Sequence, residues 1–267
     1  MVSTGGRFLL AIGLLGIWSC PAAGEIAAQC GTGPTAVEIA DAVDGHSLRL
    51  TDGRVFRLVQ IVAPLPIDND PAAAALARTS LHEIAAGKSA TLYLASDAPD
   101  RYGRLAAAAV LIEGKHWLEA ALLERGMARM FPSGNDQCMT ALLAFERKAR
   151  DARRGIWSDP RFRIFQAEEL EPLLAASGRF AVVEGTIRRI GRGRGRLYLD
   201  FGRRFTEDFT IIVPDSLRKR LEAAGADPKN WRGKRIRVRG ILFFWGGPAM
   251  EINLAQAIEL LESPASE

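Results

Sequence analysis

Apolar and polar residues alternate along the first part of the chain as half-buried β-strands require. The alternation covers residues 36–43, and similar runs follow at residues 47–50 and 55–62. Tight turns at Asp44-Gly45 and Asp52-Gly53 separate these runs. The pattern predicts an antiparallel meander of three strands.

Helical and strand-like runs then follow in a fixed order. An alanine-rich helix is predicted at residues 71–86, with Asp70 as its N-cap. Two strands are expected at residues 89–94 and 104–112, and two helices at 116–125 and 136–153. This order predicts a small five-stranded barrel of the OB type, with added helices, over residues 30–158.

The same order of elements returns in the last third of the chain. Strands are predicted at residues 180–190, 196–201 and 209–213. A helix at 215–224 should open with Asp215 as its cap, and strands at 235–244 and 249–253 close the series. We therefore expect a β-rich α+β fold with a second, smaller OB-like barrel over residues 178–262. The expected linker covers residues 159–177, and the expected tail covers 263–267.

The N-terminus has the composition of a signal peptide. Arg7 precedes an apolar run at residues 8–17, and small residues continue to Gly24. Residues 1–24 therefore predict export to the periplasm or the medium. The alternatives are a lipid anchor on Cys20 and a buried N-terminal helix. No other stretch is long and apolar enough to predict a transmembrane span.

Composition and cysteine content add two expectations. The chain has 267 residues, 48% apolar and 25% charged, as in soluble globular proteins. With Cys20 cleaved off or lipidated, Cys30 and Cys138 remain, and in an oxidising compartment they predict a disulfide rather than two free thiols. The net charge of +4 is concentrated in the last third, which favours a polyanionic partner or a solvated basic face.

Arginine is frequent in the predicted second barrel, and aromatic residues are interleaved with it. Basic surfaces with stacking aromatics are typical of OB folds that bind single strands. Alternation along a strand places Arg235, Arg237 and Arg239 on one face, with Ile236 and Val238 toward the core. The alternative assigns the aromatics to the core and the arginines to solubility. The candidate nucleic-acid-binding residues are Arg188, Arg192, Arg194, Arg196, Arg235, Arg237 and Arg239.

Four short blocks lie in order between residues 36 and 157. They are Val43-Asp44-Gly45-His46-Ser47 with Asp52-Gly53-Arg54, then residues 55–64 (VFRLVQIVAP), residues 100–106 (DRYGRLA), and Glu146-x-x-Ala149-Arg150 with residues 154–157 (RGIW). Together the blocks resemble the thermonuclease (staphylococcal nuclease) family. The second part of the chain is similar to the OB-like extension of some exported bacterial members.

The resemblance implies calcium-dependent hydrolysis of DNA or RNA, and identifies the positions that this chemistry uses. Arg57 and Arg104 match the two arginines that clamp the phosphate. His46 and Val62 stand where the family has its calcium carboxylates, and Leu65 stands at the position of the glutamate base. Because calcium requires hard oxygen ligands, the resemblance predicts a degenerate site with no metal and no cofactor.

Three functions follow as hypotheses. The first is a non-catalytic module that binds single-stranded DNA or RNA, another polyanion, or an envelope protein. The second is an active metal-dependent nuclease with a rearranged site, in which Asp68 and Asp70 supply carboxylates or His46 acts as base or metal ligand. The third is a structural interaction protein of the cell envelope. A turn that opens the helix at 71–86, with Asp70 as cap, is the preferred interpretation of the two aspartates.

Overall fold

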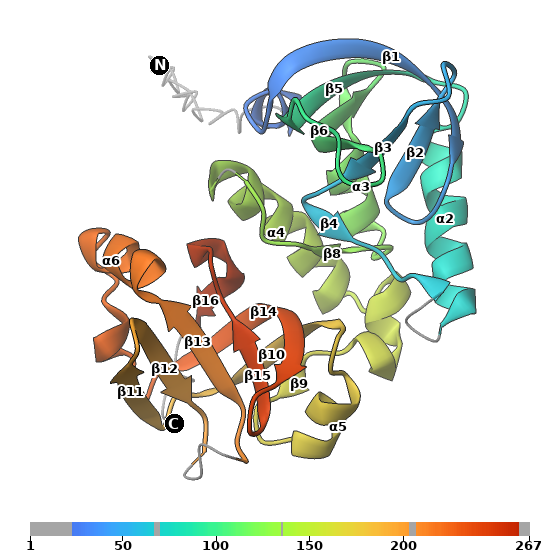
Figure 1. Cartoon of the computed structure of the whole chain (residues 1–267). Helices are drawn as coiled ribbons and strands as arrows, with labels where there is room; N and C mark the ends of the chain where they lie inside the picture. The colour runs from blue at the N-terminus through green and yellow to red at the C-terminus, as the bar shows by residue number, and fades with distance from the viewer. Residues whose placement is uncertain (1–22, 67–69, 135, 203–206, 262–267) are drawn as a thin grey trace, which may run out of the picture.

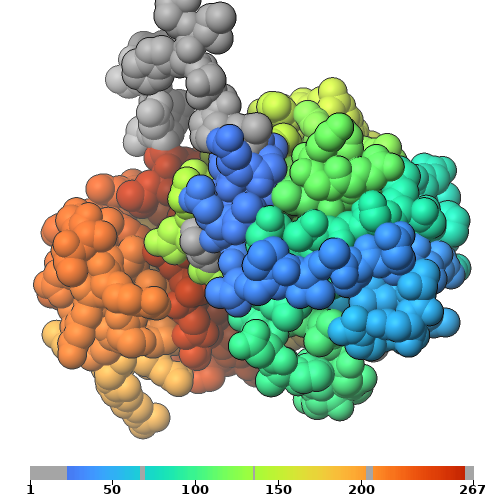
Figure 2. Space-filling view, turned by 90° about the horizontal axis from the view of Figure 1, so that it is seen from above, coloured from blue at the N-terminus to red at the C-terminus, as the bar shows by residue number. Residues whose placement is uncertain are grey.

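The computed structural model describes residues 23–66, 70–134, 136–202 and 207–261. Two lobes, each built around a β-sheet, lie on either side of helix α4 (Asp136–Asp151) (Figure 1). Figure 2 shows the same division on the surface, where the blue-to-green lobe holds the N-terminal sheet and the orange-to-red lobe holds the C-terminal sheet. The expected signal peptide and the Cys20 anchor lie outside the described residues, apart from residues 23 and 24.

The N-terminal sheet closes into a five-stranded barrel, as the sequence predicts. Its strands follow the order β3-β2-β1-β5-β6, and parallel pairing of β3 with β6 completes the circle. The two-residue strand β7 extends the sheet beyond β6. The bounds are β1 (Thr32–Ala42), β2 (Ser47–Leu50), β3 (Val55–Leu58), β5 (Ser89–Ser96), β6 (Leu105–Ile112) and β7 (His116–Trp117).

The run at residues 55–62 differs from the single strand expected there. It forms β3 and then a separate strand, β4 (Ile61–Val62), which pairs with β8 (Arg129–Met130). The chain turns between them, where the Val59 amide donates to the Ala107 carbonyl at 3.0 Å. Ile61 and Met130 are both buried, so β4 leaves the barrel wall without leaving the core.

Helices cover one side of the barrel. In α2 (Pro71–Ala85) the Asp70 side chain caps the helix by accepting from the Ala73 amide at 3.0 Å, as predicted. The helix expected at 116–125 is shorter, because its first two residues form β7 and α3 covers Leu118–Glu124. A short helix that the sequence analysis did not include, α1 (Ala23–Ala27), packs Ala27 into the barrel core.

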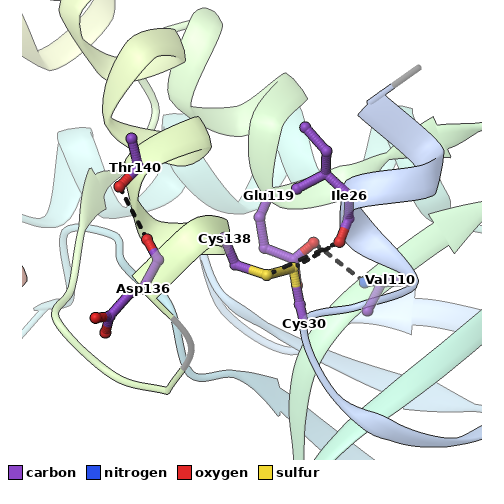
Figure 3. Close-up of a disulfide and its surroundings, with 7 residues drawn as sticks. All are labelled: Ile26, Cys30, Val110, Glu119, Asp136, Cys138 and Thr140. Atoms are coloured by element: carbon purple, nitrogen blue, oxygen red, sulfur yellow. Dashed lines mark hydrogen bonds between the residues drawn. A yellow bond between two sulfur atoms is a disulfide. The ribbon is translucent and has the colours of Figure 1, made fainter. Parts of the chain in front are cut away.

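The Cys30–Cys138 disulfide is present, as predicted. It joins the segment after α1 to the first turn of α4, across a sequence separation of 108 residues, with the two Cα atoms 5.6 Å apart (Figure 3). Glu119 of α3 lies beside it, where its Oε2 accepts from the Val110 amide at 3.2 Å. The bridge therefore fastens the start of the described chain to the helical layer of the barrel.

The second sheet has eight strands within the described residues. Seven follow the order β11-β12-β13-β15-β14-β10-β9, and β16 also pairs with β14. The bounds are β9 (Phe165–Gln166), β10 (Phe180–Thr186), β11 (Arg189–Gly193), β12 (Arg196–Asp200), β13 (Thr210–Pro214), β14 (Arg235–Phe244), β15 (Pro248–Glu251) and β16 (Ile258–Leu260).

The segment expected as a linker contributes to this second core. Phe165 of β9 and Leu173 of α5 (Leu170–Ala175) pack with the buried residues of the C-terminal sheet. Helix α6 (Asp215–Ala223) begins at Asp215, but its N-cap is Pro214 rather than the expected Asp215, whose carboxylate pairs with Arg218 at 2.8 Å. No helix among the described residues has the length and apolar character that a membrane span needs.

Candidate functional site

Arg57 and Arg104 lie on neighbouring strands of the N-terminal barrel. Arg57 is on β3 and Arg104 directly precedes β6, and the parallel register places Phe56 opposite Leu105 and Arg57 opposite Ala106. The positive charge of Arg104 contributes to lowering the pKa of the Arg57 guanidinium. The closure of the barrel therefore brings together two arginines that are 47 positions apart in the sequence.

A tight loop before β6 fixes the position of Arg104. The Asp100 carboxylate accepts hydrogen bonds from the amides of Arg104 at 3.0 Å and Tyr102 at 2.9 Å, and from the Arg104 Nε at 2.8 Å. These bonds, with the Arg104 amide foremost, lower the pKa of Asp100 to about 2. Gly103 allows the turn because it adopts a φ of 74°. Asp100 is thus an ionised carboxylate committed to Arg104.

The ring of Tyr102 gives the loop a second restraint. Its face lies 5.1 Å from the guanidinium of Arg104 and 5.0 Å from that of Arg101. The Tyr102 side chain is itself exposed. The loop therefore presents two cations around one solvent-facing aromatic ring.

Arg57 has less compensation than Arg104. Burial lowers the pKa of Arg57, and the charge of Arg104 lowers it further, while Asp44 and Asp100 offset only part of the effect. The Nε of Arg57 is buried and has no hydrogen-bond partner among the described residues. A half-buried guanidinium with an unused donor beside a second cation favours an anion as its partner.

The turn before β2 leaves His46 buried rather than exposed to solvent. His46 is 2% exposed, and its carbonyl accepts from the Leu58 amide at 2.9 Å. The Asp44 carboxylate accepts from the His46 amide at 2.8 Å and lies 3.7 Å from its Nδ1. A side chain on Gly45 would lie within 2.8 Å of Ala63 and Ala77, so the turn packs tightly against α2.

The other two positions of the family pattern carry no carboxylate. Val62 lies on β4 opposite Arg129, and both Val62 and Leu65 are half-buried. Asp70 is engaged as the cap of α2 and pairs with Arg161 at 2.9 Å, while Asp68 lies outside the described residues. Within the described ranges no three His, Cys, Asp or Glu side chains cluster to hold a metal ion. These donors do not fit calcium, which needs six or more oxygen ligands.

The arginines of the second sheet fall into two groups. Arg188, Arg192, Arg194 and Arg196 lie exposed on or beside the β11–β12 hairpin. Arg192 pairs with Asp215 at 3.8 Å and Arg196 with Glu251 at 3.7 Å. This group keeps the solvent access that a contact with nucleic acid requires.

The second group, on β14, shares one face as predicted, but that face meets protein. Arg239 is fully buried, and its guanidinium bonds the Glu146 carboxylate of α4 at 3.0 Å and Glu259 of β16 at 2.6 Å. Arg237 pairs with Glu184 at 2.9 Å and with Glu259 at 3.4 Å. The candidate role of Arg239 in nucleic-acid contact is therefore corrected to a contact between the second sheet and α4, because no solvent reaches it.

Arg235 lies at the margin of the same network. It pairs with Glu184 at 2.7 Å and remains 42% exposed. The exposure of the three β14 arginines thus decreases along the strand toward α4. Ile236 and Val238 are buried in the core of the second sheet, as the alternation predicts.

The carboxylates of this network set its electrostatics. Burial alone would lower the pKa of Arg239, but Glu146 and Glu259 outweigh it and raise that pKa above the ordinary value. Burial likewise raises the pKa of Glu259, but Arg239 and Arg237 leave it below the ordinary value. Glu146 also accepts from the Met130 amide at 2.6 Å and from Arg150 at 3.2 Å. Arg239 and Glu259 therefore each favour the charged form of the other.

Sequence reasoning missed the partners in both groups. Glu146 is in one of the motif blocks, but nothing in its spacing indicates an ion pair with a strand 93 positions later.

An aromatic pair on the second sheet is a separate feature that the sequence did not predict. Tyr198 and Trp245 stack face to face with ring centroids 5.3 Å apart. The run Phe243-Phe244-Trp245 carried a signal, because a strand that alternates cannot bury three consecutive aromatic rings.

Comparisons with known proteins address the N-terminal lobe. The family model described as Staphylococcal nuclease homologue matches residues 56–159. The matched region begins in β3 and includes both Arg57 and Arg104. No curated protein sequence matches the chain.

Proposed function

We propose that the region matched by the staphylococcal nuclease homologue model, residues 56–159, binds nucleic acid through Arg57 and Arg104 without hydrolysing it. The observation that carries the proposal is the unmatched guanidinium of Arg57. Its buried Nε has no partner among the described residues, and the neighbouring carboxylate of Asp100 is committed to Arg104. A phosphate oxygen would supply the acceptor that the protein does not.

The arrangement of the two guanidinium groups supports a phosphate as the ligand. Arg104 is held by Asp100 in a fixed orientation, and Arg57 projects from the adjacent strand. Two guanidinium groups on adjacent strands can contact different oxygens of one phosphodiester. Tyr102, exposed between Arg101 and Arg104, offers a flat apolar surface next to that position.

The absence of hydrolysis in this proposal rests on His46, Val62 and Leu65. Hydrolysis by this family uses calcium and a glutamate base, and neither Val62 nor Leu65 provides an oxygen ligand. His46 is buried in the turn before β2, and an imidazole is a poor ligand for calcium. The arginines would then bind the phosphate with no metal-activated water beside it.

We also propose that the protein acts outside the cytoplasm. The Cys30–Cys138 bridge supports this, because structural disulfides persist in oxidising compartments. The composition of residues 1–24 supports it independently. Cell fractionation with an antibody, and the mass of the purified mature chain, would test export, cleavage and lipid attachment together. A full-length chain in the cytoplasm would contradict this part of the proposal.

The binding proposal is tested by fluorescence anisotropy with labelled single-stranded DNA and RNA, each 12 nucleotides long, in the presence of a chelator. Arg57→Met and Arg104→Met should each weaken binding at least about ten-fold, because each removes a charged hydrogen-bond donor. Arg54→Met is the matched control, since Arg54 is on the same lobe, exposed and paired with Asp52. Its affinity should stay within about two-fold of the parent.

Salt gives a second readout of the same experiment. The logarithm of the binding constant should fall linearly with the logarithm of the salt concentration, and the slope should be smaller in Arg57→Met than in the parent. Equal affinities and equal slopes for the parent and both variants would overturn the proposed site. Cleavage of the oligonucleotide on addition of a metal ion would instead support an active nuclease with a rearranged site.

A further inference from the structure

The second sheet carries an aromatic pair at its surface, far in sequence from the arginines of the barrel. Tyr198 of β12 and Trp245 of the β14–β15 turn stack with parallel rings, 5° apart in orientation. Trp245 is 42% exposed and the neighbouring Phe244 is 66% exposed. Rings that served only as core packing would be shielded from water, so the exposure requires another explanation.

Glycines keep the space next to Tyr198 open. On the facing strand β11, Gly191 lies directly opposite Tyr198 in the hairpin register, and Gly193 lies beside its ring. A side-chain carbon at either position would lie 3.8–3.9 Å from Tyr198, so any longer side chain would cover this ring. Glycine within a strand weakens it, and such glycines often mark a place where a ligand approaches closely.

A cavity of about 460 Å³ occupies this place. The stacked pair, the two glycines and the start of the hairpin form its walls. The polar groups at its rim are Asp200 and three arginines, Arg189, Arg192 and Arg194. A volume of several hundred Å³ with aromatic walls and a few polar groups is typical of a site for a small planar group.

The three arginines at the rim differ in their carboxylate partners. Arg189 is fixed by the buried carboxylate of Asp200, whose oxygens accept from the Arg189 Nε at 2.9 Å and from the Thr210 hydroxyl at 3.0 Å. Arg194 stands at the tip of the hairpin with a φ of 50°, next to Gly195 with a φ of 73°. No carboxylate of the described residues lies within salt-bridge distance of Arg194. Arg192 lies 3.8 Å from Asp215, so two of the three guanidinium groups have a carboxylate partner and that of Arg194 is available to an anion.

Positive charge continues along the sheet edge from the same cavity. A second hollow of about 590 Å³ shares Arg189 with the first and is bordered by Arg188, Arg232 and Phe201. Arg188 and Arg232 are both exposed. Because β11 is at the edge of the sheet, this basic track lies along an open side of the lobe.

We infer that Tyr198, Trp245 and the arginines of the β11 edge form a second ligand site, which stacks a nucleobase on the aromatic pair and binds its phosphates along the basic track. The site takes a planar base joined to phosphate, either a free nucleotide or one residue of a single strand. It lies on the opposite lobe from Arg57 and Arg104, and uses none of their contacts. This second site would add to nucleic-acid binding by the barrel, but it does not depend on the site at Arg57 and Arg104.

The test uses the full mature chain and three labelled or competing probes, at low salt and with a chelator. They are an oligonucleotide of ten thymidines, the same backbone with abasic residues, and thymidine monophosphate. Trp245→Ala should weaken binding of the thymidine oligonucleotide at least about ten-fold and leave binding of the abasic strand within about two-fold. Trp245→Phe should restore most of the affinity, since it retains a ring that can stack.

Phe244→Ala is the matched control, because Phe244 is adjacent, aromatic and more exposed, but does not line the cavity. Its affinity should stay within about two-fold of the parent for every probe. Arg194→Ala should weaken both the thymidine and the abasic strand, because it removes a phosphate contact rather than a stacking contact. Thermal unfolding of each variant establishes that the lobe remains folded.

The probes also separate the two sources of the ligand. Tight binding of thymidine monophosphate, with no gain for the longer strand, would assign a nucleotide site. A gain of at least about ten-fold for the strand would assign a single-strand site. Repeating the series in an Arg57→Met background separates this site from that of the barrel. Equal affinity of Trp245→Ala and the parent for the thymidine strand in that background would overturn the inference, whatever the outcome at Arg57.

Discussion

Arg57 and Arg239 are both arginines on β-strands that lie largely or wholly away from water, but the protein treats their charges differently. Arg239 is fully buried and meets two carboxylates, Glu146 and Glu259, at hydrogen-bonding distance. Arg57 is half-buried beside a second arginine and keeps a buried Nε without a partner among the described residues. The ion pairs of Arg239 connect the second sheet to α4. The unpaired Nε of Arg57 is instead a donor that a ligand can bind.

The difference shows that a row of arginines does not by itself identify a binding surface. Arg235, Arg237 and Arg239 follow the alternation of a strand and resemble a basic groove in the sequence. In the fold, that face meets α4 and β16. The carboxylates packed against a strand, and not the number of its arginines, decide whether its charge is available.

The largest expected effect concerns the matched pair. Arg239→Met should lower the free energy of unfolding by about 3–5 kcal/mol, because it removes the buried guanidinium that contacts the carboxylates of both Glu146 and Glu259. Urea denaturation followed by circular dichroism measures the change. The double variant Glu146→Gln with Arg239→Met should recover part of the loss, because the fully buried carboxylate is then absent while Glu259 keeps Arg237 as its partner. A single variant within about 1 kcal/mol of the parent would contradict the role of the pair.

A third buried ionisable side chain, Glu119, has no arginine partner in the described part of the chain, and burial favours its protonated, neutral form. Burial raises the pKa of Glu119 to about 8 from its ordinary value of 4.5. The folded state therefore binds this proton more tightly than the unfolded state. The stabilisation is complete below about pH 4.5 and is lost as the pH rises toward 8, by at most about 1.4 kcal/mol per pH unit.

Glu119→Gln should remove this dependence, because glutamine has a similar shape and does not ionise. Urea midpoints at pH 5, 6.5 and 8 would be compared between the variant and the parent. The difference between the two proteins isolates Glu119, since the histidines are common to both. The variant should gain stability relative to the parent as the pH rises, and two parallel pH profiles would contradict the assignment.

The unmatched arginine predicts an effect of opposite sign. Arg57→Met should raise the free energy of unfolding by about 0.5–1 kcal/mol in the absence of a ligand, because it removes a partly desolvated charge with incomplete compensation. The same variant should lose affinity for nucleic acid. A gain in stability that accompanies a loss in binding is the expected signature of a binding site. Destabilisation by Arg57→Met would place Arg57 with Arg239 as a structural residue.

The smallest effect is expected at the exposed end of β14. Arg235 pairs with Glu184 at 2.7 Å, but 42% of its side chain is exposed. Arg235→Ala should therefore change the free energy of unfolding by less than about 1 kcal/mol. The series Arg235→Ala, Arg237→Ala and Arg239→Ala should show a loss that grows as exposure decreases. Equal losses at all three positions would show that burial does not control the strength of these pairs.

Local signals determined most of the fold that could be predicted. The Asp70 cap, the closed five-stranded barrel and the Cys30–Cys138 bridge all follow from residue types at short or countable spacings. The split of residues 55–62 into β3 and β4 could not be predicted in this way, because β4 pairs with β8, which lies far later in the chain. Apolar residues continue across that split, so the sequence pattern contains no mark of it.

The candidate site divides in the same way. The motif blocks identify Arg57 and Arg104, and the barrel register brings the two residues together. The partners of Arg237 and Arg239 depend on how α4 and β16 dock on the second sheet. That arrangement involves residues up to 112 positions apart. No periodicity or local motif carries information about such a contact.

Binding without cleavage is the central claim, and one titration tests it most directly. A labelled single strand would be incubated with the mature protein in calcium, in manganese and in a chelator, beside Arg57→Met. The bound fraction and the intact fraction would be measured on the same samples. We predict equal binding in all three solutions, an intact strand throughout, and weaker binding by Arg57→Met. Metal-dependent cleavage that disappears in Arg57→Met would contradict the account and identify a working nuclease.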